Sequence, residues 1–189
     1  MEVCQLMAEL TIAVDTNEQK PHHYLDGVEV SKGEVVRYSS AKLDTFDYAV
    51  AGDWEEWEGH KTKRVRFAIE RKSVSDFIGS WFSSKSKQER AKIRRARAAW
   101  GDTLPIIYVV EGSERDIEQY PYLRWFPSGR MSAKVVKARI SDLQMDCVQV
   151  ILCDDRKHAE DKIVSLLKRR WRKVRFKKAT KRGGSDGGK

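Results

Sequence analysis

The stretch Ile69-Glu70-Arg71-Lys72-Ser73-Val74-Ser75-Asp76 reads as the end of a strand that runs directly into a helix. From residue 64 to residue 72, apolar and polar residues alternate. The apolar set is Val65, Phe67 and Ile69. Because successive side chains of a strand point to opposite faces, Glu70 and Lys72 are predicted to project together from the polar face.

A carboxylate and an ammonium side by side at the end of a strand suit metal-assisted phosphodiester cleavage. Glu70 can hold a divalent cation, and Lys72 can position the attacking water and offset developing charge on the phosphorus. The pattern E-x-K is also typical of solvated strand residues, so the pair alone does not decide between the two.

The residues after the strand predict a capped amphipathic helix. Ser73 and Asp76 have the S-x-x-[DE] spacing of a capping box, in which each side chain satisfies an unpaired N–H of the other's residue. An apolar stripe at helical spacing follows, formed by Val74, Phe77, Ile78 and Trp81. On spacing alone, Asp76 is a helix cap.

The string from Glu70 to Asp76 resembles the ERKxxxD signature of the XPF/Hef-type nuclease domain, a branch of the PD-(D/E)XK superfamily. Three further pieces occur in the family's order. Asp15-Thr16-Asn17-Glu18 resembles its D-x-R-E, Asp47-Tyr48 resembles its G-D-Y, and residues 105–112 resemble a later core strand that ends in Glu-Gly. The resemblance covers residues 10–170.

Two residues depart from the family pattern. Asn17 stands where the family usually has Arg, and Phe46 stands where it has Gly. Neither departure removes a carboxylate, so they bear on turn geometry and activity level and leave the reaction type unchanged.

The resemblance implies a restriction-endonuclease-like α/β fold, a mixed β-sheet flanked by helices. The sequence itself predicts strands at residues 10–15, 34–38, 45–51, 64–72, 105–110 and 148–152, and helices at 88–100, 132–145 and 155–171 in addition to the capped one. The run from Pro105 to Val110 is apolar on both faces, as in a strand covered by helices on each side.

The resemblance also implies a Mg²⁺- or Mn²⁺-dependent DNA endonuclease of repair or recombination that acts on branched or flapped DNA. Oxygen-only ligands suit such a hard cation. The predicted metal ligands are Asp15, Glu18, Asp47 and Glu70. The predicted catalytic residues are Asp47, Glu70, Lys72, Arg71 and Asp76. Lys72 would orient and help deprotonate the water, and Arg71 would brace the turn by pairing with Asp76.

The net charge of +9 is unevenly distributed along the 189 residues. From residue 168 onward there are eleven basic residues and one acid, so this segment carries +10 and the preceding chain about −1. A second basic cluster lies between residues 85 and 97. Two such patches favour a polyanionic partner. The predicted DNA-binding residues are Lys85, Lys87, Arg90, Arg94, Arg95, Arg97, Arg175, Lys177 and Lys178.

The chain is predicted to form one nuclease domain, residues 1–173, followed by a basic, Gly-rich and disordered tail, residues 174–189. Relatives commonly carry a tandem helix-hairpin-helix module after the nuclease, and no such pattern follows Trp171. The tail or a partner chain would supply that contact. The resemblance further implies a homodimer formed through the nuclease domain.

Composition favours an intracellular protein. The longest apolar run, residues 104–110, is far shorter than the roughly 20 residues of a membrane span, and no secretion signal is recognisable at the N-terminus. The three cysteines are odd in number and lack metal-ligand spacing.

Two aromatic segments leave alternatives open. The acidic loop from Gly52 to Lys61 is either a substrate-sensing flap or a packed loop tip. If exposed, the aromatic, proline-rich segment from Tyr120 to Pro127 would stack on unpaired bases or form a dimer contact. If buried, it would seal a loop over the core.

Two rival functions remain at this stage. A nuclease-like module could bind DNA or a partner without cutting, and a basic RNA- or ribosome-associated protein would explain the tail. Inactive relatives would be expected to lose acidic motif residues, and here the carboxylates are retained, which favours the enzyme.

Overall fold

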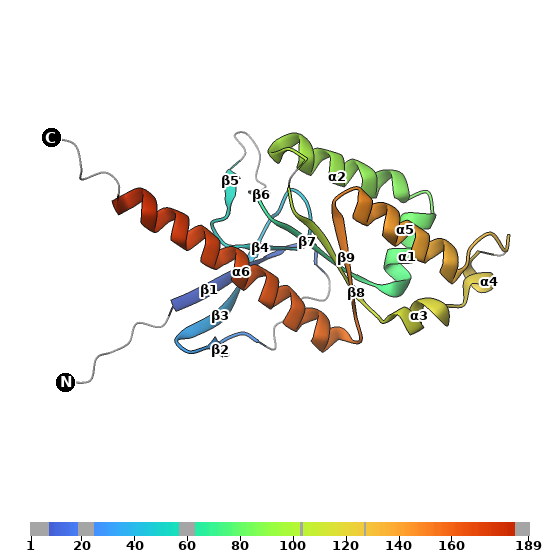
Figure 1. Cartoon of the computed structure of the whole chain (residues 1–189), viewed down its shortest axis with the longest axis horizontal. Helices are drawn as coiled ribbons and strands as arrows, with labels where there is room; N and C mark the ends of the chain where they lie inside the picture. The colour runs from blue at the N-terminus through green and yellow to red at the C-terminus, as the bar shows by residue number, and fades with distance from the viewer. Residues whose placement is uncertain (1–7, 19–24, 57–62, 103, 127, 184–189) are drawn as a thin grey trace.

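The computed structural model describes residues 8–18, 25–56, 63–102, 104–126 and 128–183; the side chains of residues 56, 68 and 176–183 are outside the description. A seven-stranded mixed sheet forms its centre, in the order β2-β3-β1-β4-β7-β8-β9 (Figure 1). These strands are β1 (Ala8–Asp15), β2 (Glu29–Ser31), β3 (Glu34–Ala41), β4 (Tyr48–Val50), β7 (Ala68–Ser73), β8 (Ile106–Glu111) and β9 (Val148–Cys153). A separate hairpin pairs β5 (Trp54–Glu56) with β6 (Lys63–Val65).

Helices cover the two faces of the sheet unequally. They are α1 (Val74–Phe82), α2 (Ser86–Trp100), α3 (Glu114–Glu118), α4 (Tyr122–Trp125), α5 (Ala133–Met145) and α6 (Arg156–Gly183). The long helix α6 packs against one face of the sheet, and its residues Ile163 and Leu167 belong to the hydrophobic cluster on that face. Residues of α1, α2 and α5 belong to the cluster on the other face (Figure 1). The predicted fold class, a mixed sheet flanked by helices, is confirmed.

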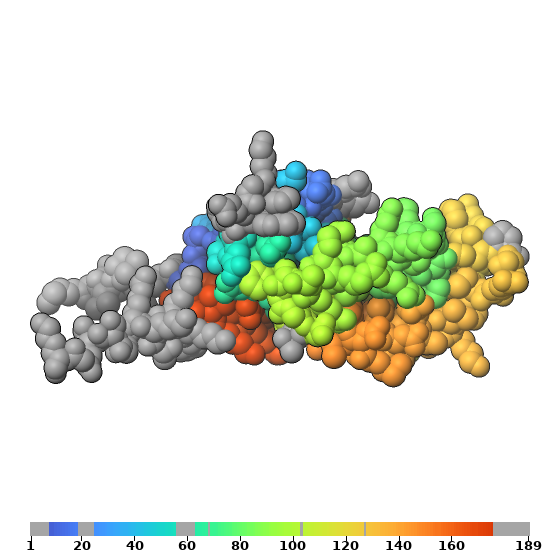
Figure 2. Space-filling model, turned by 90° about the horizontal axis from the view of Figure 1, so that it is seen from above, coloured from blue at the N-terminus to red at the C-terminus, as the bar shows by residue number. Residues whose placement is uncertain are grey.

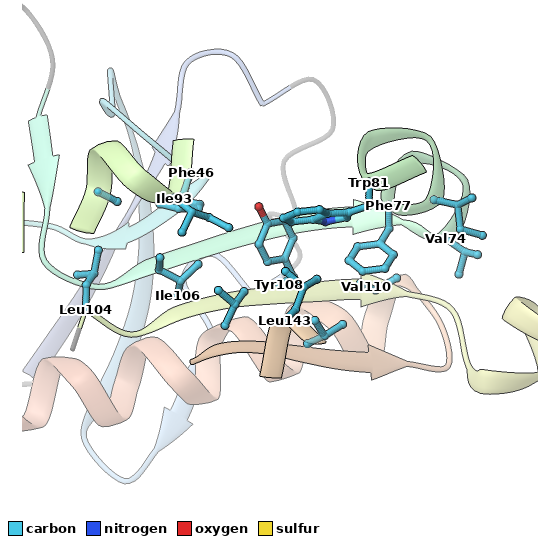
Figure 3. Packing of buried hydrophobic residues seen from close by; sticks show 14 of the residues in the cluster. Phe46, Val74, Phe77, Trp81, Ile93, Leu104, Ile106, Tyr108, Val110 and Leu143 are labelled. Atoms are coloured by element: carbon cyan, nitrogen blue, oxygen red, sulfur yellow. The ribbon is translucent and has the colours of Figure 1, made fainter. Parts of the chain in front are cut away.

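The strand β8 confirms the prediction of a strand buried on both faces. Ile106, Tyr108 and Val110 lie in the cluster formed with α1, α2 and α5, and Ile107 and Val109 lie in the cluster formed with α6. Figure 3 shows Tyr108 projecting from β8 among Ile93, Trp81 and Phe77. Its ring meets those of Phe77 and Trp81 edge-on, at centroid distances of 6.2 and 5.9 Å.

The predicted single strand from residue 64 to residue 72 is wrong, because the chain forms two strands there. β6 pairs with β5, the chain bends at residues 66–67, and β7 joins the main sheet. The bend moves the apolar residues to different sides: Val65 belongs to the α1–α2 cluster, while Ile69 belongs to the α6 cluster. The alternation remains correct within β7, where it matters for Glu70 and Lys72.

Several predicted bounds also change. The strand predicted for residues 45–51 keeps only Tyr48–Val50, and β2 forms at Glu29–Ser31, where no strand was predicted. The closing helix does not stop at Trp171. It continues to Gly183, so the expected disorder from Val174 is wrong for residues 174–183. Lys, Arg and Ala are good helix formers, and no Gly or Pro interrupts them before Gly183.

None of the helices in the described parts of the chain is long and apolar enough to cross a membrane.

Candidate active site

Three segments that carry motif carboxylates lie side by side. The backbone N–H of Asp15 donates to the carbonyl of Asp47 (2.8 Å), and the N–H of Asp47 donates to the carbonyl of Ile69 (3.0 Å). These bonds join the end of β1, the start of β4 and the middle of β7, where Tyr48 is paired with Ile69 in antiparallel register. The segments that carry the predicted metal ligands Asp15, Asp47 and Glu70 therefore meet through backbone hydrogen bonds.

Phe46 turns the chain immediately before Asp47. Its φ of 67° lies in the left-handed region. A residue with a side chain adopts this conformation at a cost of about 1 kcal/mol. The ring is nevertheless buried, with 3% of its surface exposed. This is the position at which the resembling family has glycine, and here the burial of a large ring offsets the backbone strain.

Glu70 is the centre of the site. It is 3% exposed, and the Lys92 ammonium donates to both of its carboxylate oxygens at 2.8 Å. The Lys72 ammonium lies 3.0 Å from one of the same oxygens. Glu70 and Lys72 come from β7, whereas Lys92 comes from α2, which packs over this face of the sheet.

A buried acid on α2 holds the other side of Lys72. Glu89 lies 3.1 Å from the Lys72 ammonium, and its second oxygen accepts a hydrogen bond from the buried Tyr108 hydroxyl at 2.8 Å. Burial raises the pKa of Glu89, but Lys72 and Lys92 outweigh it, so the pKa lies below its usual value. Glu89 is thus ionised at neutral pH, and it fixes Lys72 between two carboxylates.

The charge state of Lys72 follows from these neighbours. Burial lowers the pKa of Lys72, but Glu70 and Glu89 more than compensate and raise it to about 12. At neutral pH this amine therefore carries its proton and can donate to water or to a phosphate oxygen. This favours the orienting part of its expected role over the deprotonating part.

The ionised form of the Asp47 carboxyl is disfavoured by its surroundings. Burial, followed by the nearby Glu70 carboxylate, raises the pKa of Asp47 well above its usual value. One of its oxygens accepts the backbone N–H of Arg71 at 2.8 Å. The half-buried Asp47 carboxylate and the buried Glu70 carboxylate act on each other electrostatically, and such a like-charged pair favours a nearby cation.

Arg71 projects to the opposite face of β7 and pairs there with two acids. Its guanidinium donates to Glu18 and to Glu111, each at 2.7 Å, and all three side chains are largely buried. The expected pairing of Arg71 with Asp76 is wrong, because alternation in β7 sends Arg71 toward the first strand's turn. Glu18, expected as a metal ligand, is instead placed in an ion pair.

Asp15 and Asp76 form hydrogen bonds with nearby backbone and hydroxyl groups. The Asp15 carboxylate accepts the N–H groups of Leu43 (2.9 Å) and Asn17 (3.2 Å). Ser73 caps α1: its hydroxyl oxygen accepts the N–H of Asp76 (3.1 Å), and the same hydroxyl donates to the exposed Asp76 carboxylate (2.7 Å). The Ser73 half of the predicted capping box is confirmed, whereas the Asp76 carboxylate accepts the Ser73 hydroxyl and not the Ser73 backbone N–H.

A sequence model of the ERCC4 domain matches residues 14–166, most of the chain. The chain belongs to the ERCC4 domain family. This is a family of structure-specific nucleases, and the XPF-type resemblance of the motifs is confirmed. A search of curated proteins found no match.

The fold of this ERCC4 domain is similar to a solved structure of XPF from Aeropyrum pernix, with a TM-score of 0.53 and 20% sequence identity. The match covers 84% of this chain and 60% of the XPF chain. The ERCC4 domain described here thus spans about three fifths of the structure that it resembles.

The four predicted metal ligands do not form one cluster. Among the described residues, no group of three or more His, Cys, Asp or Glu side chains is arranged to hold a metal ion. Asp47 and Glu70 lie together on the α2 side, Glu18 lies with Arg71, and Asp15 braces the turn before Leu43. The sequence alone did not separate these roles, because they depend on which neighbours the fold supplies.

Sequence reasoning did not assign four residues of the site, namely Lys92, Glu89, Tyr108 and Glu111. A signal for Glu89 exists, since it is the only acid between Lys85 and Arg97. Lys92 follows it by three residues and so lies on the same side of the helix. For Tyr108 the partner is distant in sequence and no local pattern marks it, whereas Glu111 is the Glu of the Glu-Gly piece that ends the later core strand.

Most basic residues in and just before α2 are exposed, and some of them also line a cavity. Lys85, Lys87, Arg90, Arg94 and Arg95 are exposed. Arg90, Arg94 and Arg97 line a cavity between α2 and α5, together with Arg139, and Arg97 donates to the carbonyl of Asp146. Figure 2 shows α2, in yellow-green, along the middle of one face of the molecule.

Of the predicted DNA-binding residues in the C-terminal segment, Arg175 is exposed and lies over the Trp171 ring at 4.7 Å. Lys177 and Lys178 belong to the helical backbone of α6, and their side chains lie outside the described residues.

The aromatic segments give a mixed outcome. Tyr122 is buried and its hydroxyl donates to the carbonyl of Ile117, whereas Leu123 is 73% and Trp125 59% exposed. One half of the segment seals the core and the other faces solvent. In the acidic loop, Trp54 is part of β5 and packs against the core, while Trp57 lies outside the described residues.

Proposed function

We propose that this ERCC4 domain is a divalent-metal-dependent DNA endonuclease in which Asp47 and Glu70 hold the metal and Lys72 serves the attacking water. The observation that supports the proposal most is the pair formed by the half-buried Asp47 and the buried Glu70 at the junction of β4 and β7. A lysine two residues after Glu70 shares that face, in a family of structure-specific nucleases.

The residues present fit a hard divalent cation. Burial, followed by the Glu70 carboxylate, raises the pKa of Asp47, so an added positive charge would be favourable there. The Lys92 ammonium on both oxygens of Glu70 supports the same point. Mg²⁺ is commonly bound through one or two carboxylates, with water and substrate phosphate completing its shell. Two protein carboxylates therefore suffice, and Mn²⁺ takes the same oxygen ligands.

The chain's own residues then divide the work. Asp47 and Glu70 bind and orient the cation, which when bound supplies Lewis acidity toward the phosphodiester and lowers the pKa of a bound water. Lys72 keeps its proton and donates a hydrogen bond to the oxygen of the attacking water or to a non-bridging phosphate oxygen, while the water would release its own proton to solvent. Glu89 and Tyr108 hold Lys72 in place, and Arg71 ties β7 to Glu18 and Glu111 so that the strand does not shift.

The DNA substrate would approach over α2. This helix supplies the exposed Lys85, Lys87, Arg90, Arg94 and Arg95 on the element that also carries Lys92 and Glu89. Charge of this kind binds phosphates without regard to sequence, which suits an enzyme that recognises the shape of branched or flapped DNA. Dimerisation through the nuclease domain and a role in repair or recombination belong to the same proposal, by analogy with the family.

A panel of labelled DNAs tests the proposal. Flap, fork, nicked and four-way substrates are incubated with the full chain, with and without Mg²⁺ or Mn²⁺, in parallel with Glu70→Gln. We expect cleavage of at least one branched substrate that requires the metal and that Glu70→Gln abolishes. Tight binding of the branched DNAs without cleavage under any metal condition would instead establish the rival function, a nuclease-like binding module.

A further inference from the structure

We propose that Lys92 occupies the cation position at Glu70 in the metal-free protein, and that a divalent cation binds in exchange for the Lys92 ammonium. This inference rests on the proposed function, because it takes the Asp47–Glu70 pair to be the metal site. It adds a residue that the ERCC4 motifs do not contain and gives it a defined effect on metal affinity.

The contacts of Glu70 define what has to be displaced. Lys92 donates to both Glu70 oxygens at 2.8 Å, and Lys72 adds a contact of 3.0 Å to one of them. A Mg²⁺ ion would lie at roughly 2.0–2.1 Å from the oxygen that it binds. An ammonium that holds both oxygens and a divalent cation on the same carboxylate repel each other, so one of the lysines must leave.

The surroundings of the two lysines decide which one leaves. Lys72 is held by two carboxylates, Glu70 and Glu89, and its side chain is 13% exposed. Among the described residues, Lys92 forms its ion pair with Glu70 alone, although it lies near enough to Glu89 to help lower that pKa, and its side chain is 24% exposed. Its flexible stem can therefore swing the charge into solvent, toward an arriving phosphate, while α2 stays in place.

Phe46 contributes to the resting position of Lys92. The ammonium lies 5.4 Å from the centre of the Phe46 ring, within the range of a cation–π attraction. Phe46 also holds the left-handed backbone that precedes Asp47. The residue that departs from the family's glycine thus forms, with Glu70, the place in which Lys92 rests.

Metal binding measured by calorimetry tests the exchange directly. Mn²⁺ is titrated into the full chain of the wild type, Lys92→Met, and Lys87→Met, which removes an exposed charge from the same helix. If Lys92 covers Glu70 for about nine tenths of the time, the apparent Kd tightens about 10-fold in Lys92→Met. Lys87→Met should stay within about 2-fold of the wild type, because that charge is distant from the carboxylates and screened.

A second measurement needs no substitution in the site. Wild-type protein is treated with an amine-acetylating reagent, with and without Ca²⁺, and the modified lysines are identified by mass spectrometry. Lys92 should become several-fold more reactive when Ca²⁺ is present, whereas Lys72 should stay slow and Lys87 fast in both conditions.

The outcomes separate this inference from the proposed function. If Mn²⁺ binds to the wild type and is lost in Asp47→Asn, but Lys92→Met and Lys87→Met have the same affinity, the metal site stands and the exchange is wrong. Unchanged reactivity of Lys92 on addition of Ca²⁺ would overturn the exchange in the same way. If neither the wild type nor Lys92→Met binds Mn²⁺, both proposals fail together.

Discussion

Glu89 looks like a solvent-exposed helix residue in the sequence, but in the folded protein it belongs to the candidate active site. It lies in a helix whose other charged residues between 85 and 97 are all basic, yet it is buried and contacts Lys72 and Tyr108. Because the pKa of Glu89 is lowered in the folded protein, its ionisation contributes stability above its usual pKa. That contribution is lost as the pH falls through the folded pKa.

The substitution Glu89→Gln should therefore cost stability in a pH-dependent way. At pH 7 it removes a charged partner of Lys72 and a charged acceptor for Tyr108, which should lower the free energy of unfolding by about 1–3 kcal/mol. The difference from the wild type should shrink as the pH drops below about 4.3, where the unfolded chain's glutamate takes up a proton. Urea unfolding at a series of pH values measures it, with the exposed Asp102→Asn as control.

Tyr108→Phe tests the same network through a neutral group. It removes the 2.8 Å bond to Glu89 and leaves the ring packing unchanged. We expect single-turnover cleavage to fall several-fold while Mn²⁺ affinity stays within about 2-fold, because Lys72 is loosened and the metal carboxylates are not touched. Tyr122→Phe, which also loses a buried hydroxyl bond but lies on α4, should cleave like the wild type. Equal effects of the two substitutions would assign Tyr108 to stability alone.

At the scale of elements, local sequence patterns correctly predicted the helices, strands and caps that depend mainly on residues close together in the chain. The alternation near Ile69 and the cap at Ser73 place the strand-to-helix junction correctly, and the uninterrupted apolar run predicts β8 with both faces buried. The bend between β6 and β7 was not predicted, because the apolar alternation continues across it. The left-handed φ of Phe46 was missed because a phenylalanine gives no sign of it.

The candidate site was predictable to a similar degree. The motif residues Asp47, Glu70 and Lys72 are brought near one another, as expected. The pairing of Arg71 with Glu18 and Glu111 joins residues 53 and 40 positions apart, and only the sheet order creates it. The same holds for Lys92, which reaches Glu70 because α2 packs over β7.

Helix α2 is expected to be an electrostatic contact for DNA. The double substitution Arg90→Gln with Arg94→Gln should weaken binding and flatten the slope of log K against log salt by about 0.9 for each lost duplex contact. Salt-titrated binding to one flap DNA measures this slope. The matched control, Arg115→Gln with Lys134→Gln, removes two exposed charges from α3 and α5. A slope that changes equally in both pairs would mean that only net charge matters.

At the scale of the whole molecule, α6 joins the core to the basic C-terminal segment. Its first half buries Ile163 and Leu167, and ion pairs fix it to the sheet side: Arg170 with Asp53 at 2.6 Å and Lys168 with Glu34 at 3.2 Å. The basic excess of the sequence lies mostly beyond these contacts. The backbone of α6 continues beyond these contacts to Gly183.

Truncation after Val174 separates the charge from the core. It removes six basic residues and Asp186, a change of five charges, and spares Trp171 and the ion pairs of α6. We expect weaker DNA binding and a flatter salt slope, with saturating single-turnover cleavage nearly unchanged because the site residues all precede residue 112. Superimposable salt slopes of the full and truncated chains would remove the segment from DNA binding and leave α2 as the main contact.

The central claim is that Asp47 and Glu70 form the metal site of a DNA-cleaving enzyme, and one rate comparison tests it most directly. Single-turnover cleavage of a flap DNA in saturating Mg²⁺ is measured for the wild type, Asp47→Asn and Asp44→Asn. Asp44 is the matched control, a partly buried acid three residues away whose side chain accepts from Thr45. Asp47→Asn should lose at least about 100-fold in rate with DNA binding retained, while Asp44→Asn should cleave within about 3-fold of the wild type. Cleavage by Asp47→Asn at the wild-type rate would contradict the account.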